Sequence, residues 1–168
     1  MTITIVTERL DVQEVAAHPS IKVIEPLLTA ITKTLTPTVV ENLPPYFHDI
    51  VTIEDAKHWL DKMLDESRLL LVKEQSSNEI IGFLFISNSD YSEAHIGYLL
   101  SEKHWGKGLA TELLSGFIEM AARLKQWKKL VGGVDVTNKA SSKLLTRLGF
   151  KKASAKDGIV FYEITLVK

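Results

Sequence analysis

The stretch His104–Thr111, HWGKGLAT, places two glycines one residue apart between an apolar run and the start of a helical pattern. Each Gly in a helix interior costs about 0.5–1 kcal/mol relative to Ala, so the pair predicts a group that approaches the backbone closely. A strand that runs through Gly-x-Gly into a helix suits a phosphate, because the first helical N–H groups lack intrahelical partners and the dipole end is positive. Taken alone, the stretch is equally typical of a tight turn between a strand and a helix.

Composition limits the class of protein. A chain of 168 residues fits a single domain, 1–168, and a chain of this size buries about two thirds of its unfolded surface. The formal net charge of -1 predicts no broad surface for nucleic acid or an anionic membrane. The absence of cysteine excludes a disulfide framework, a thiolate zinc site and a Cys nucleophile. With neither a signal peptide nor a long apolar stretch, a soluble cytoplasmic protein is expected, without a metal site.

Hydrophobic periodicity predicts helices and strands along the whole chain. Apolar residues recur at helical spacing over 21–35, from Thr52 to Leu64, from Lys107 to Leu124 and over 140–148. Apolar, β-branched runs predict strands over 2–15, as one strand or a bent pair, and over 68–74, 79–87, 93–100, 129–136, 150–154 and 159–167. Thr52 and Asp55 resemble a capping box, and the three prolines of 36–50 predict a long loop.

Two phosphate-binding motifs do not fit the glycine pair. A Walker loop needs Gly, four residues and then Gly-Lys-Ser/Thr, and the chain contains no such string. A dinucleotide fingerprint would put Thr111 at its third glycine, and Asp135 comes too late for the ribose-binding acid.

Four motifs together resemble the Gcn5-related N-acetyltransferase (GNAT) superfamily. In chain order they are Gly97-Tyr98-Leu99-Leu100, Trp105-Gly106-Lys107-Gly108-Leu109-Ala110, Asn138-Lys139-Ala140-Ser141 and Leu148-Gly149-Phe150. The opening Thr7-Glu8-Arg9-Leu10 is similar to the RimJ/RimL branch, which also has Trp where other members have Gln or Arg at the start of the pyrophosphate motif. The resemblance is specific over 93–151, weaker over 68–92 and slight over 16–67.

The resemblance implies an α/β (α+β) fold. Such proteins have a mixed, mostly antiparallel central sheet of six or seven strands, flanked by about four helices. The strand bearing Tyr98 and the strand 131–136 would splay apart and leave a cleft between them.

The resemblance also implies acetyl-CoA as co-substrate. Pantetheine would lie in the cleft and pair with the backbone of Leu99 and Leu100, almost as an added strand. Residues 106–110 would cradle the pyrophosphate, and Asn138 would lie near the far wall. The cofactor-binding residues implied in this way are Tyr98, Leu99, Leu100, Trp105, Gly106, Lys107, Gly108, Leu109, Ala110, Thr111, Asn138 and Ser141.

The implied reaction is direct transfer of the acetyl group to an amine. The catalytic candidates are the Ser141 hydroxyl, pointing towards the thioester, and a main-chain N–H near Leu99, steadying the oxyanion. Many members of the superfamily have a Tyr acid where this chain has Leu145. A purely structural role explains each residue equally well: Asn138 would be a helix N-cap, and Ser141 would bond to its own helix.

No general base stands out from the sequence. Glu93, His95 and Asp135 lie on or near the strands that border the cleft, although each is better explained as a solvated strand-end residue. The resemblance points to an acceptor wall formed by Tyr46, Phe47 and His48, while Trp59, Met63 and Leu64 are read as helix core. Lys139, Lys143 and Arg147 form a basic stripe that is either solvated or in contact with the CoA 3′-phosphate.

Several alternatives stay open at this point. The acceptor is a protein α-amine or a small-molecule amine such as a polyamine, an amino sugar or an amino acid. Neither nucleic acid nor membrane is expected as a partner, and a homodimer is compatible with the sequence. A rival hypothesis is an acyl-CoA-binding or sensing module without turnover, because Leu145 replaces the usual acid and no base is evident.

Overall fold

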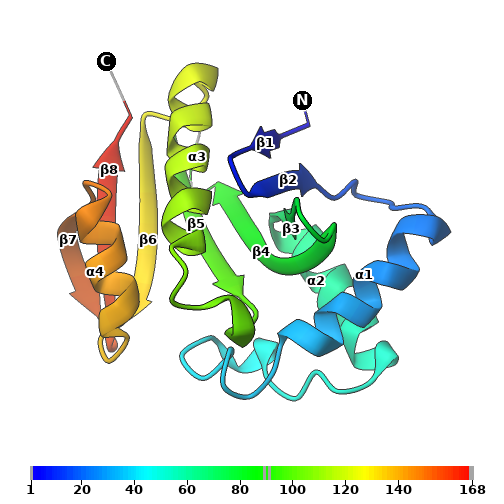
Figure 1. Cartoon of the computed structure of the whole chain (residues 1–168). Coiled ribbons are helices and arrows are strands. Elements are labelled where there is room, and N and C mark those ends of the chain that lie inside the picture. The colour runs from blue at the N-terminus through cyan, green and yellow to red at the C-terminus, as the bar shows by residue number, and fades with distance from the viewer. Residues whose placement is uncertain (1, 89, 91, 167–168) are drawn as a thin grey trace.

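The computed structural model describes residues 2–88, 90 and 92–166, which form one mixed sheet with helices on both faces (Figure 1). The strand order is β1-β2-β3-β4-β5-β6-β8-β7, and only the β5–β6 pair is parallel within the described residues. The strands are β1 (Thr4–Val6), β2 (Leu10–Glu14), β3 (Arg68–Glu74), β4 (Glu79–Asn88), β5 (Glu93–Leu100), β6 (Lys129–Asp135), β7 (Lys151–Lys156) and β8 (Ile159–Thr165).

This architecture confirms the α/β class and the mostly antiparallel mixed sheet. The described residues contain eight strands instead of six or seven, because 2–15 contributes two of them. Residue 167, the end of the last predicted strand, lies outside the described residues.

The described residues also form four α-helices and two short 3-10 helices. Thr52 and Asp55 form the predicted capping box, since the hydroxyl of Thr52 accepts from the Asp55 N–H at 3.0 Å and the Asp55 carboxylate accepts from the Thr52 N–H at 2.9 Å. No helix within the described residues is both long and apolar enough to span a bilayer. The helices are α1 (Ile21–Thr34), α2 (Ile53–Glu66), α3 (Leu109–Leu124), α4 (Lys139–Arg147), η1 (Pro45–Phe47) and η2 (Glu102–His104).

Two hydrophobic cores cover the two faces of the sheet. Along β3, Leu70 and Val72 pack into the core that α3 closes, whereas Leu69 and Leu71 pack into the core that α1 and α2 close. This division follows from the alternation of side chains along a strand. Strands β3, β4 and β5 are therefore packed on both faces.

The parallel strands β5 and β6 separate part-way along their length, as predicted. Their pairing runs from Glu93 with Lys129 to Ile96 with Gly132 and stops there, although β5 continues to Leu100 and β6 to Asp135. The outer neighbours β4 and β8 stay paired to the ends of these strands. Beyond the Ile96–Gly132 pair, β5 and β6 therefore make no ladder with each other, and each keeps its ladder with its outer neighbour.

The start of α3 differs from its prediction. The helix begins at Leu109, not at Lys107, because Gly106 (φ +71°) and Gly108 (φ +78°) adopt the left-handed conformation, which an α-helix cannot contain. The two glycines therefore form the turn that enters the helix, with Gly108 at the N-cap.

Candidate functional site

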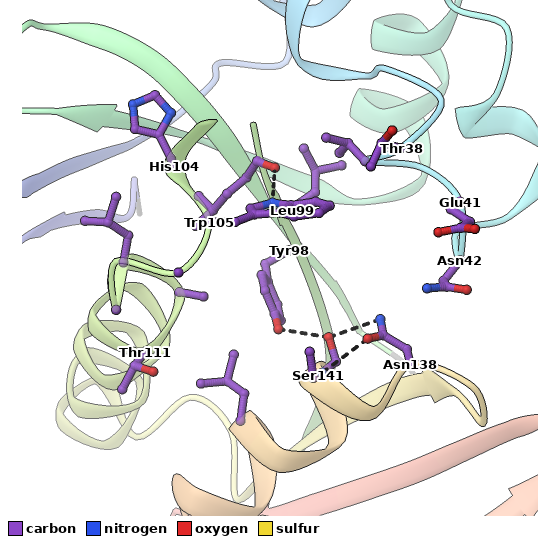
Figure 2. A pocket seen from close by; sticks show the side chains of 18 of the residues that line it. Thr38, Glu41, Asn42, Tyr98, Leu99, His104, Trp105, Thr111, Asn138 and Ser141 are labelled. Carbon is purple, nitrogen blue, oxygen red and sulfur yellow. Dashed lines mark hydrogen bonds between the residues drawn. The ribbon is translucent and has the colours of Figure 1, made fainter. Parts of the chain in front are cut away.

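A cavity of about 560 Å³ lies at the end of β5, beyond the last β5–β6 pair (Figure 2). It brings together every residue implied as cofactor-binding except Lys107. Its lining comes from the loop after α1 (Thr38, Val39, Glu41, Asn42, Leu43), from β5 (Tyr98, Leu99, Leu100), from the turn and first residues of α3 (His104, Trp105, Gly106, Gly108, Leu109, Ala110, Thr111), and from α4 with its N-cap (Asn138, Ala140, Ser141, Leu144, Arg147).

The turn before α3 leaves its backbone open towards this cavity. A Cβ added at Gly106 would meet no atom within 4 Å, and one added at Gly108 would meet only the Arg9 guanidinium, at 3.6 Å. No side chain caps α3, so its first N–H groups have no side-chain acceptor. An anion placed here would meet free N–H donors at the positive end of the helix dipole.

Trp105 ties this turn to the end of β5. Its indole Nε1 donates to the backbone carbonyl of Leu100 at 2.8 Å, while the buried His104 is bonded through Nδ1 to Ser101 Oγ at 2.5 Å. The carbonyl of Leu100 keeps one further acceptor position. The Trp at this position therefore braces the turn against the strand, a contact that the motif alone did not predict.

Lys107 is exposed and does not line the cavity, but its backbone carbonyl has a partner. Its carbonyl accepts from Arg9 Nη1 at 2.9 Å, and Arg9 Nε also donates to the Glu112 carboxylate at 2.7 Å. Arg9 belongs to the opening motif that carried part of the family resemblance, but sequence alone assigned it no role.

Three polar side chains meet on the α4 side of the cavity (Figure 2). The hydroxyl of Tyr98 lies 3.0 Å from Ser141 Oγ, and Asn138 Nδ2 donates to the same Oγ at 3.3 Å. The Asn138 side chain also accepts from the Ser141 N–H at 3.2 Å. Asn138 is thus the N-cap of α4 and part of the cavity wall at once, and the Ser141 hydroxyl faces Tyr98 instead of its own helix.

Comparison with known proteins identifies the family. The acetyltransferase (GNAT) domain model matches residues 25–151. This chain belongs to the GNAT family.

Curated relatives of this GNAT chain match it over part of their length. The uncharacterized N-acetyltransferase p20 of Bacillus licheniformis is 34% identical over 85 residues, 49% of this chain and 47% of that protein. The ribosomal protein uS5-alanine N-acetyltransferase of Escherichia coli (strain K12) is 36% identical over 83 residues, 47% of this chain and 43% of that protein. The chain thus spans less than half the length of these relatives.

The fold itself is shared along nearly the whole chain. A solved structure of RimL, the ribosomal L7/L12 alpha-N-protein acetyltransferase in complex with coenzyme A, has a TM-score of 0.75 at 20% identity. The superposition covers 97% of this chain and 98% of that one.

At position 145, where the family resemblance implies a Tyr in many members, this chain has a Leu that packs in the first core. Leu145 is 2% exposed, and its Cδ1 lies 3.2 Å from where a Cβ on Gly132 would stand. The hydroxyl that faces α4 comes instead from Tyr98 on β5. Burial raises the pKa of Tyr98 and outweighs the opposite effect of its hydrogen bond to Ser141, so the phenol keeps its proton at neutral pH.

None of the three candidate bases reaches the cavity. Glu93 pairs with Lys129 at 3.1 Å, and Asp135 accepts from the hydroxyl and the N–H of Thr137. The hydrogen bond from the Thr137 hydroxyl, and to a smaller extent the one from its N–H, holds the pKa of Asp135 below its usual range. Neither these residues nor His95 lines the cavity.

The three residues predicted as an acceptor wall do not line the cavity. Phe47 packs into the second core with its ring centroid 5.6 Å from that of Trp59, because an aromatic side chain is stabilised more by burial under α2 than beside water. His48 Nε2 bonds to the Leu43 carbonyl at 2.9 Å, and neither Phe47 nor His48 nor Tyr46 lines the cavity. The preceding loop lines the cavity instead, through Thr38, Val39, Glu41, Asn42 and Leu43. Trp59 and Met63 are buried as expected, and Leu64 is partly buried.

The cavity lining carries charges of both signs. Glu41 is the one carboxylate among the described residues that line it, and Arg147, from the last turn of α4, is the one guanidinium. In Figure 2 Glu41 and Thr111 lie on opposite sides of Ser141. Of the predicted basic stripe, only Arg147 reaches the cavity. No group of three or more metal-ligating side chains occurs among the described residues.

Proposed function

We propose that this GNAT chain transfers the acetyl group of acetyl-CoA directly to an acceptor amine. The observation that carries the proposal is the joint lining of one cavity by the unpaired end of β5 and by the open glycine turn of α3. Pantetheine would pair with the edge of β5 that no longer pairs with β6 beyond Ile96, and the pyrophosphate would lie on 106–110. The complex of RimL with coenzyme A supports the same choice of co-substrate.

The proposed chemistry needs a neutral amine held against the thioester. The amine nitrogen attacks the acetyl carbonyl carbon, a main-chain N–H near Leu99 stabilises the oxyanion, and the carbon–sulfur bond then breaks. The proton lost by the nitrogen ends on the CoA sulfur or in solvent. A thiol with a pKa near 8.5 leaves readily as thiolate, and a chain without cysteine has no thiol to carry the acetyl group itself.

The acceptor we propose is the α-amino group of a protein N-terminus. This choice is supported by the resemblance to the RimJ/RimL branch and by the alanine N-acetyltransferase activity named for the Escherichia coli relative. The Glu41 carboxylate, on the opposite side of Ser141 from Thr111 in Figure 2, would attract an incoming ammonium group. The absence of cysteine also supports the cytoplasm as the place of action.

An acceptor panel tests the proposal. The chain is incubated with acetyl-CoA and peptides that differ only in their first residue, with polyamines, amino sugars and free amino acids as competing classes. Release of free CoA thiol and a mass gain of one acetyl group report transfer, and a peptide already acetylated at its N-terminus is the control. Calorimetric CoA binding without transfer to any amine would favour the non-catalytic binding module, whereas transfer only to small amines would overturn the proposed acceptor.

A further inference from the structure

Asn138 fixes the hydrogen-bonding state of Ser141. The Asn138 Oδ1 accepts from the Ser141 N–H at 3.2 Å, so the other end of the amide, Nδ2, faces Ser141 Oγ and donates to it at 3.3 Å. A hydroxyl oxygen has two acceptor positions and one hydrogen. One acceptor position of Ser141 Oγ is therefore filled by Asn138.

The remaining contact of Ser141 Oγ is with the Tyr98 hydroxyl, at 3.0 Å. Between them the two hydroxyls carry two hydrogens, of which one lies in this bond and the other is free. If Tyr98 donates, both acceptor positions of Ser141 are filled and its hydrogen has no acceptor among the described residues. That hydrogen then points to the cavity, which both side chains line.

We propose that Tyr98 is a positioning residue: it donates to Ser141 and so turns the Ser141 hydroxyl hydrogen towards the sulfur of the bound thioester. The proposal rests on the proposed acetyl transfer. A phenol is more acidic than an aliphatic hydroxyl and is the better donor of the two, which sets the direction of this hydrogen bond.

Tyr98 does not lose its proton in this arrangement. Its pKa lies above the ordinary value of 10.0 because the phenol is buried, whereas the leaving CoA thiol has a pKa near 8.5. Transfer of the phenol proton to the thiolate would therefore run uphill. The Ser141 hydroxyl instead stabilises negative charge on the sulfur through an O–H···S hydrogen bond as the carbon–sulfur bond breaks, and the amine supplies the proton that ends on the thiol.

A double-mutant cycle tests the proposal. We expect Tyr98→Phe to lower kcat about 5- to 20-fold, the loss of one well-aligned hydrogen bond, with KM for acetyl-CoA changed less than about twofold. Ser141→Ala should cost about 10- to 100-fold, within or below the usual contribution of general acid–base groups. Because Tyr98 acts through Ser141, the double variant should be no slower than Ser141→Ala. Tyr162→Phe is the matched control, since Tyr162 also packs partly buried against the first core but lies outside the cavity lining.

A second variant acts on the same hydroxyl from its other side. Asn138→Asp keeps the oxygen that caps α4 but replaces the Nδ2 donor by a carboxylate oxygen, to which Ser141 would donate. The hydroxyl hydrogen would then leave the cavity, and kcat should fall to the level of Ser141→Ala.

The possible outcomes separate the proposal from the proposed function. The positioning role would be overturned if the losses in kcat of the two single variants multiplied in the double variant, or if Tyr98→Phe raised KM at constant kcat. Either result would leave acetyl transfer in place. A larger loss in Tyr98→Phe than in Ser141→Ala would mean that the phenol contacts the substrate itself, which also contradicts the proposal. Absence of transfer by the unaltered chain to every amine would overturn both.

Discussion

Arg9 donates from Nη1 to the backbone carbonyl of Lys107 at 2.9 Å, across 98 positions of sequence. The same guanidinium donates from Nε to Glu112 Oε1 at 2.7 Å, and the Arg9 N–H donates to Glu112 Oε2 at the same distance. The turn between β1 and β2 therefore holds both the glycine turn and the first turn of α3. The conformation of the proposed pyrophosphate cradle depends on a residue outside it.

Arg9→Ala should weaken CoA binding about 3- to 10-fold, because the Lys107 carbonyl loses a charge-assisted donor and the glycine turn gains freedom. Calorimetric titration with CoA measures the change. Arg123→Ala is the matched control, since Arg123 forms an exposed ion pair with Glu119 at 3.1 Å on the same helix and lies outside the main cavity. Equal CoA affinity in the two variants would show that the turn keeps its shape without Arg9.

Gly108→Val should abolish CoA binding. A β-branched residue at φ +78° is strained, and its side chain would enter the space assigned to a phosphate oxygen. Gly158→Val carries similar strain at φ +80° in the turn between β7 and β8, where an added Cβ meets no atom within 4 Å, whereas one at Gly108 meets Arg9 Nη2 at 3.6 Å. Thermal unfolding should show a loss of stability in both variants, and CoA titration a loss of affinity in Gly108→Val alone. A folded Gly108→Val variant with unchanged affinity would refute the cradle.

Local patterns were sufficient to predict much of this fold. The turn at Gly106 and Gly108 and the capping box at Thr52 depend on residues close together in the chain, whereas the separation of β5 and β6 was expected only from the family resemblance. The start of α3 was misplaced by two residues because apolar spacing does not report a positive φ at Gly108.

Contacts between distant segments could not be predicted in this way. Tyr98 and Ser141 are 43 positions apart, and their hydrogen bond depends on how α4 packs beside β5. The aromatic residues at 46–48 indicated a wall, but burial of Phe47 under α2 turned them away and left Glu41 and its neighbours at the cavity. Apolar character alone does not say which of two cores a side chain joins.

Arg147→Ala should weaken CoA binding more than Lys107→Ala does. Arg147 lines the cavity, whereas Lys107 contributes only a backbone carbonyl to the described contacts. Lys107→Ala should therefore lower CoA affinity less than about tenfold. If Arg147 contacts the 3′-phosphate, its removal should have little effect on the binding of 3′-dephospho-CoA. Lys143→Ala, on the same helix but outside the cavity lining, is the control. Equal losses for both ligands would place Arg147 away from that phosphate.

Glu14 should make stability depend on pH under acidic conditions. Burial raises its pKa, but hydrogen bonds from Arg68 and the Ile3 N–H outweigh burial and bring the pKa below the ordinary value of 4.5. A carboxylate whose pKa is lower in the folded state than in the unfolded state stabilises the fold. That stabilisation is complete at a pH above the pKa of the unfolded state, and it is lost as the pH falls through the pKa of the folded state. Urea unfolding at about pH 7 and about pH 3 should show a smaller difference in Glu14→Gln than in the unaltered chain. Glu54→Gln, at a highly exposed side chain, should leave that difference unchanged.

The pH dependence of turnover should follow the acceptor and not the enzyme. A free α-amino group with a pKa near 7.7–8.0 is partly neutral at physiological pH, whereas a lysine amine near 10.4 is mostly protonated. Glu93, His95 and Asp135 lie outside the cavity lining, and the described groups there that could remove the proton are the exposed Glu41 and the buried His104, whose Nδ1 is bonded to Ser101 Oγ. We expect neither to act as a dedicated base. We therefore expect kcat/KM to rise with pH up to the pKa of each acceptor, so that two acceptors of different amine pKa give displaced profiles. One bell-shaped profile common to both, collapsing in Glu41→Gln or on neutralisation of any of the other three, would reveal a dedicated base.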